Sequence, residues 1–137
     1  MCGIVGLHLR NPDLYPRLGE LLTGMLCEMG ERGPDSAGVA VYGDPTMTPP
    51  GRACVSVLQT EPRAADLGID ATVARYDETY LVTADVESAE LLDAVRTSHP
   101  DAVIAGFGTD MAVLKGVGHP RVLTESWELA KAQGWQG

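Results

Sequence analysis

The feature that most restricts the fold is a stripe of apolar residues over residues 18–29. The stripe follows the i, i+3, i+4, i+7, i+8 and i+11 positions of one amphipathic helix, namely Leu18, Leu21, Leu22, Met25, Leu26 and Met29. The apolar run at residues 2–9 (CGIVGLHL) ends at Arg10-Asn11-Pro12, and it predicts a strand followed by a turn. A second strand is expected at Val39–Tyr42. The first third of the chain therefore predicts an α+β arrangement.

The rest of the chain begins with a connection rich in proline and glycine at residues 43–52 (GDPTMTPPGR). Beyond it, the pattern predicts strands at residues 54–58, 79–83, 102–107 and 111–117, and helices at residues 88–97 and 121–133. We divide the chain into residues 1–43, a small α+β unit at residues 44–118, and a helical segment at residues 119–137. The fold class expected for the whole chain is α+β.

Composition excludes several classes of protein. A chain of 137 residues with 45% hydrophobic residues is long enough to bury one core. The formal net charge of -9 argues against a nucleic-acid partner, which requires clustered Lys and Arg. No apolar stretch approaches the ~20 residues that span a bilayer, so no membrane association is expected. The three cysteines (Cys2, Cys27, Cys54) match no zinc or redox spacing, and a reducing cytoplasm is predicted.

Cys2 is the main candidate for a catalytic residue. Cysteine is small, so aminopeptidases are expected to remove Met1 and leave Cys2 with a free α-amine. In model peptides an α-amine has a pKa of about 8 and a cysteine thiol of about 8.5. One residue then supplies both a nucleophile and its general base. Gly3 lets a substrate approach the backbone closely, because it has no Cβ. The alternative is a cysteine without function at this position.

A second motif, the turn-rich loop at residues 32–38 (RGPDSAG), lies between the helix and the second strand. Together with residues 1–6 (MCGIVG), it resembles the class II glutamine amidotransferase domain, an N-terminal-nucleophile (Ntn) hydrolase. The resemblance implies that Cys2 is the nucleophile and that Arg32 holds the N-terminal segment in place. It also implies a supporting or substrate-binding role for Gly3, Gly33, Asp35 and Ser36. A plain cation at the helix end is the alternative for Arg32.

The finer resemblance is to the amidotransferase-like subunit of N-methylglutamate synthase. It rests on the Gly33-Pro34-Asp35 form of the loop and on two segments, residues 39–44 (VAVYGD) and residues 108–118 (GTDMAVLKGVG). By this resemblance, residues 44–118 are an insert in the amidotransferase domain. The resemblance implies the N-terminal part of an αββα Ntn sandwich, with glutamine or glutamate as substrate and synthase subunits as partners. It implies no cofactor and no metal.

The sequence departs from the family after the second strand. The family continues to a His-Thr-Arg motif that binds the glutamine carboxylate and to an Asn-Gly pair that forms the oxyanion hole. Neither a His-Thr nor an Asn-Gly dipeptide occurs in this sequence. We therefore expect a truncated chain with little or no activity, whose 119–137 helix leads toward a missing remainder. We further expect the isolated chain to be loosely folded, aggregated, or ordered only through residues 53–118 or a partner, because the stripe at residues 18–29 would lack cover.

Two functions remain open at this point. The first is a glutamine amidotransferase that passes ammonia to a synthase partner. The second is a non-catalytic interaction subunit that retains part of the amidotransferase fold. Other features support neither. Gly106-Phe107-Gly108 followed by Met111 is not a dinucleotide fingerprint, and the three histidines lack metal-ligand spacing. Trp127 and Trp135 are expected to be buried in the core.

Overall fold

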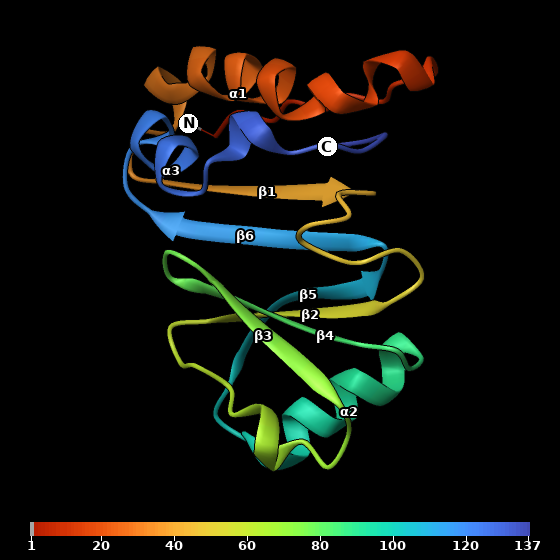
Figure 1. Cartoon of the computed structure of the whole chain (residues 1–137). Helices are drawn as coiled ribbons and strands as arrows, with labels where there is room; N and C mark the ends of the chain where they lie inside the picture. Colours follow the sequence, from red (N-terminus) through yellow and green to blue (C-terminus); the bar gives the residue numbers. More distant parts are fainter. Residues whose placement is uncertain (1) are drawn as a thin grey trace.

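The computed structural model describes residues 2–137, and Met1, whose removal the sequence predicts, lies outside the described residues. The fold is mixed α+β with antiparallel sheets, which confirms the expected fold class. Figure 1 shows helix α1 (Leu18–Glu28), a two-stranded sheet, a four-stranded sheet and helix α2 (Ser88–Ser98) following one another through the molecule. No helix within residues 2–137 is long and apolar enough to cross a membrane.

The two-stranded sheet joins strands from opposite ends of the chain. Strand β1 (Ser36–Tyr42) pairs antiparallel with strand β6 (Met111–Val117), in a register that runs from Ser36 opposite Val117 to Tyr42 opposite Met111. β1 begins three residues earlier than the sequence predicts, so Ser36 lies in the strand and not in the loop. β6 falls within the predicted 44–118 unit, and it nevertheless shares a sheet with residues of the 1–43 unit.

The expected strand at residues 2–9 is wrong. This segment forms one isolated antiparallel bridge, between His8 and Gln136, and no named strand. Its backbone partner is the short tail at residues 135–137, to which Leu7 and Leu9 donate their N–H groups, each at 2.8 Å. A strand requires a partner along its whole length, and residues 2–6 have none among the described residues. The same tail also bridges to Tyr42 at the end of β1.

The four-stranded sheet has the order β3-β4-β2-β5 and belongs to the 44–118 unit. Its strands are β2 (Ala53–Leu58), β3 (Ala71–Tyr76), β4 (Thr79–Ala84) and β5 (Val103–Thr109). Helix α2 covers one face and buries Leu91, Leu92 and Val95 against this sheet. The sequence did not predict β3, because Arg75 and the polar residues around it interrupt the apolar pattern. The hairpin turn to β4 is made by Asp77, whose φ is +57°.

The expected helix at residues 121–133 is shorter and broken. Helix α3 (Pro120–Ser126) begins with Pro120 in its first turn, and the His119 Nδ1 accepts the Arg121 N–H at 3.2 Å. It ends before Glu128, whose φ of +52° is incompatible with a continuing helix. A 3-10 turn, η4 (Leu129–Lys131), follows. Short 3-10 turns also occur at Pro12–Arg17 (η1), Gly30–Arg32 (η2) and Ala64–Asp66 (η3).

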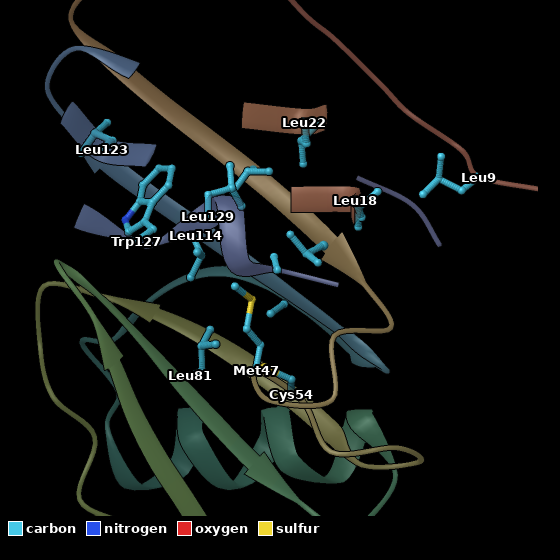
Figure 2. Close-up of a cluster of buried hydrophobic side chains, with 14 residues drawn as sticks. Leu9, Leu18, Leu22, Met47, Cys54, Leu81, Leu114, Leu123, Trp127 and Leu129 are labelled. Atoms are coloured by element: carbon cyan, nitrogen blue, oxygen red, sulfur yellow. The ribbon is translucent and has the colours of Figure 1, made fainter. Parts of the chain in front are cut away.

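This break allows the end of the chain to cover α1. Figure 2 shows Trp127, Leu129, Leu18, Leu22 and neighbouring apolar side chains gathered in one cluster between α1, α3 and the sheets. Leu18 and Leu22 are fully buried, and the other stripe residues are half-buried. The expectation that the stripe would lack cover is therefore wrong. Trp127 is buried as predicted, whereas Trp135 is 36% exposed and lies against Gly43.

Candidate functional site

The candidate site is a cavity of about 570 Å³ at one end of the two-stranded sheet. This volume is typical of small-molecule sites. The cavity is lined by all of the site residues that the sequence predicts: Cys2, Gly3, Arg32, Gly33, Asp35 and Ser36. Residues far apart in the sequence thus meet on one cavity, as the pairing of the two motifs predicts.

The loop that carries Arg32, Gly33 and Asp35 is held at both ends by backbone contacts. On its first side, the Arg32 N–H donates to the Met29 carbonyl at 3.0 Å at the end of α1. On its second side, the Gly118 N–H donates to the Asp35 carbonyl at 2.8 Å, and Ser36 opposite Val117 starts the β1–β6 ladder. The side chains of Arg32, Asp35 and Ser36 remain exposed.

Gly3 lies where the N-terminal segment passes over the end of α1. A Cβ at Gly3 would overlap the Met29 side chain and would lie 3.7 Å from the Arg32 Cβ. The N-terminal segment therefore lies directly against the stem of Arg32. A larger residue at this position would displace only the flexible end of the Met29 side chain, so packing alone does not require a glycine here. Cys2, one residue earlier, is exposed at the cavity.

Sequence reasoning missed one wall of the cavity, which the 44–118 unit supplies. Leu58 ends β2 and Gln59 follows it, Glu78 precedes β4, and Lys115 lies in β6. The Gln59 N–H donates to the Glu78 carbonyl at 2.9 Å and so joins the two strand ends. No motif gives these positions a role, although Lys115 lies in the 108–118 segment, and they reach the cavity through the packing of the two sheets.

The lining carries charges of both signs: Arg32 and Lys115 are cationic, and Asp35 and Glu78 are anionic. Among residues 2–137, ion pairs occur only at Arg17–Glu20, Arg63–Asp66 and Lys131–Glu128, so none of the four lining charges is paired with another. The described part of the chain also has no cluster of three His, Cys, Asp or Glu residues that could hold a metal ion.

The three cysteines differ in their access to solvent. Cys2 is exposed, Cys27 is half-buried with its Sγ 3.8 Å from the Thr124 Oγ1, and Cys54 is buried in β2. Desolvation raises the pKa of the Cys54 thiol from 9.0 to about 11, against the opposing effect of hydrogen bonds to Thr48 and Ser56. A buried, protonated thiol is a poor nucleophile. Cys2 is thus the cysteine best placed to react.

The raised pKa of Cys54 predicts a loss of stability at alkaline pH. The folded protein holds this proton more tightly than the unfolded chain, so the contribution is complete below pH ~9 and is lost as the pH rises through ~11. Two pKa units correspond to about 3 kcal/mol in the free energy of unfolding. Between pH 8 and pH 11.5, the free energy of unfolding of wild type should fall by about 3 kcal/mol more than that of Cys54→Ala, as measured by urea denaturation. Parallel pH profiles for the two proteins would contradict the assignment.

Comparison with known proteins adds one relative. The chain is 36% identical, over a 149-residue alignment that covers all of it, to the glutamine amidotransferase-like protein GlxB of Rhizobium meliloti (strain 1021). The chain is related to glutamine amidotransferase-like proteins. It spans 48% of the length of this relative. No family model matches the chain, and no solved structure matches it.

This relationship agrees with the motif at residues 1–6 and the loop at residues 32–38. The alignment also covers residues 44–118, so the similarity includes the unit that supplies the second wall of the cavity. The relationship supports an amidotransferase-type chain.

Proposed function

We propose that this chain carries the nucleophilic part of a class II glutamine amidotransferase of the Ntn type, with Cys2 as the nucleophile. The observation that carries the proposal is the convergence of exposed Cys2 and the 32–36 loop on one cavity. The similarity to a glutamine amidotransferase-like protein over the whole chain supports it. Gly3, Arg32, Gly33, Asp35 and Ser36 would position the N-terminal segment or contact the substrate.

The chemistry follows from one residue that holds both reacting groups. The α-amine of Cys2 takes the thiol proton, and the sulfur attacks the side-chain amide carbon of glutamine. As the tetrahedral intermediate collapses, the carbon–nitrogen bond breaks and the amine returns the proton to the departing ammonia. Water then attacks the glutamyl thioester, which releases glutamate and restores the thiol. The ammonia would pass to a synthase partner of the glutamate or N-methylglutamate type, in the cytoplasm.

Turnover by these 137 residues alone is expected to be low. The sequence has no His-Thr-Arg or Asn-Gly dipeptide pattern that could supply the family's carboxylate anchor and oxyanion donor. Loss of one oxyanion donor reduces kcat by about 10²–10³-fold in other acyl-transfer enzymes. Thiol reactivity toward a glutamine mimic is therefore a better test of the proposal than ammonia release.

We expect the glutamine analogue 6-diazo-5-oxo-L-norleucine to modify Cys2 slowly but selectively. Mass spectrometry of digested protein should show adducts on Cys2 at least tenfold in excess over Cys27, with Cys54 unmodified, because only Cys2 is exposed. Excess L-glutamine should suppress the reaction, and Cys2→Ser should abolish it. Iodoacetamide, which does not resemble glutamine, is the control reagent. If L-glutamine occupies the cavity, it should protect Cys2 from modification by the diazo analogue and by iodoacetamide.

The same spectra test maturation. The N-terminal peptide of wild type should begin at Cys2, because a retained Met1 would tie up the amine that serves as base. Retention of Met1 on most molecules, or labelling of Cys2 and Cys27 at equal rates, would contradict the nucleophile assignment.

The alternative function is a non-catalytic interaction subunit that retains part of the amidotransferase fold. The observation that favours it is the acidic net charge of -9, which would suit docking onto a partner. Under this alternative, Cys2 reacts with iodoacetamide at the rate of an ordinary exposed thiol. L-glutamine does not protect Cys2, and the diazo analogue does not label it selectively.

A further inference from the structure

The four-stranded sheet has two outer strands, β5 and β3, and their outer edges differ. The ladder between β5 and β2 shifts its register between Ser56 and Val57, and such an irregularity twists an edge away from further pairing. β3 instead pairs with β4 in an unbroken register over all 6 of its residues. No strand pairs with the other edge of β3 within residues 2–137, and Figure 1 shows β3 at the front of the sheet. β3 therefore presents a regular and unoccupied edge.

The residues of β3 do not protect this edge. Natural edge strands are commonly protected by proline, by a bulge or by lysine side chains, and residues 71–76 (ATVARY) contain one charged residue and no proline. The charged residue is Arg75, whose Nε donates to the Asp77 carbonyl at 2.9 Å and whose guanidinium carbon lies 5.8 Å from the centre of the Tyr80 ring. Tyr80 is opposite Arg75 in β4, so the guanidinium lies over the sheet and not across its edge. The edge is thus open to a further strand.

The charges around β3 indicate which strand fits. Twelve of the nineteen acidic residues of the chain lie in residues 44–118, which contain five basic residues. Asp70 directly precedes β3, and Asp77 and Glu78 directly follow it. None of the three takes part in an ion pair within residues 2–137. Pairing of β3 with β3 of a second copy would bring acidic ends together in either direction, which is unfavourable, whereas a strand with basic ends would meet opposite charges.

We propose that the outer edge of β3 binds an extended segment of a partner protein that carries Lys or Arg at both of its ends. The backbone of β3 supplies the hydrogen bonds of an added strand, and the acidic residues at its two ends select the basic partner. The 44–118 unit is then a docking element as well as a wall of the cavity. This inference goes beyond the chemistry at Cys2 and is independent of it, because β3 contributes no residue to the cavity.

The test uses a fluorescein-labelled peptide, Lys-(Thr-Val)3-Lys, which matches the span from Asp70 to Asp77. Its binding to the 137-residue chain is followed by fluorescence polarisation at low ionic strength, where charges are least screened. We expect it to bind about tenfold more tightly than Glu-(Thr-Val)3-Glu, because favourable charge pairs at both strand ends become unfavourable ones. A third peptide with proline in place of each threonine cannot pair as a strand and should not bind. Hydrogen exchange should slow within residues 71–76 when the Lys peptide is bound.

Variants of the protein locate the contact. Ala74→Lys places a lysine on the exposed side of β3 and should weaken binding of the Lys peptide by about tenfold. Ala89→Lys, on the exposed side of α2, is the matched control, because it changes the net charge equally and should leave the affinity nearly unchanged. Asp70→Asn combined with Asp77→Asn should lower the preference for the Lys peptide over the Glu peptide. Asparagine tolerates the positive φ at position 77, so this variant preserves the hairpin.

Three results would overturn the proposal. The first is equal affinity for the Lys and Glu peptides, or no binding of either. The second is equal weakening by Ala74→Lys and Ala89→Lys, which would place the contact elsewhere on the acidic surface. The third is a dimer in sedimentation velocity whose amides at residues 71–76 are protected without peptide, because a second copy would then occupy the edge. Labelling of Cys2 should be the same in wild type and Ala74→Lys, so the docking edge and the proposed function succeed or fail separately.

Discussion

Trp127→Ala is expected to lower the free energy of unfolding by about 3–5 kcal/mol, the usual range for removing a fully buried aromatic side chain. Trp127 is 1% exposed and heads the fully buried side chains in volume. Its ring lies in the cluster of Figure 2 with Leu123, Leu129 and Leu114. A whole protein of this size is stable by only about 5–15 kcal/mol, so urea denaturation should show a large fall in the midpoint.

Trp127→Phe is the matched control. The Trp127 Nε1 is buried and has no hydrogen-bond partner among residues 2–137. Phenylalanine retains much of the apolar volume and removes this unpartnered donor, whose burial is itself unfavourable by about 1–3 kcal/mol. We expect Trp127→Phe to lose less than half of what Trp127→Ala loses. A loss of under about 1 kcal/mol in Trp127→Ala would mean that residues 120–132 do not cover α1 in solution.

Gly19→Ala is the second change with a large expected effect, a loss of about 1–3 kcal/mol or more. Gly19 is a buried residue of α1, and its N–H donates to the Ala132 carbonyl at 2.8 Å. An added Cβ would overlap the Leu129 carbonyl oxygen and lie 2.7 Å from the backbone nitrogen of Ala132. Backbone atoms cannot rotate away as a side chain can, so η4 would have to move off the helix.

Gly24→Ala separates this contact from helix propensity. Gly24 lies in the same helix and is exposed, and a Cβ there would meet nothing within 4 Å. Alanine in an exposed helical position is favoured over glycine by about 1 kcal/mol, so Gly24→Ala should stabilise the protein. Opposite signs for the two substitutions in thermal and urea unfolding would confirm the close packing of η4 on α1. Stabilisation by both would show that η4 lies elsewhere.

The sequence paired residues 1–6 with residues 32–38, and in the structure both segments line one cavity. The two segments are short and carry their chemistry locally, in a small N-terminal nucleophile and a turn between a helix and a strand. All six residues selected in this way line the cavity. Glu78 could not be found by the same reasoning, because it is an ordinary charged residue beside a strand. Lys115 lies in the 108–118 segment that carries the finer resemblance, but that resemblance gives it no role. Lys115 joins the cavity when β6 pairs with β1 across more than 60 residues of sequence, and Glu78 joins it because the neighbouring Thr79 hydroxyl bonds to the Lys115 backbone.

The sequence by itself determined the elements whose pattern is local. The apolar period of residues 18–29 determined α1, and the apolar runs of residues 54–58, 79–83 and 111–117 determined most of β2, β4 and β6. Tertiary structure decided the rest. Residues 2–9 have an apolar strand composition but find only the three-residue tail as a partner, so they form a bridge and no strand. Residues 121–133 have helical composition, yet the helix ends before Glu128 and the chain folds back over α1. The break in the helix allows Trp127 and Leu129 to be buried against Leu18 and Leu22. A continuous helix would satisfy the local helix propensity, but it would not bring η4 into contact with the apolar stripe of α1.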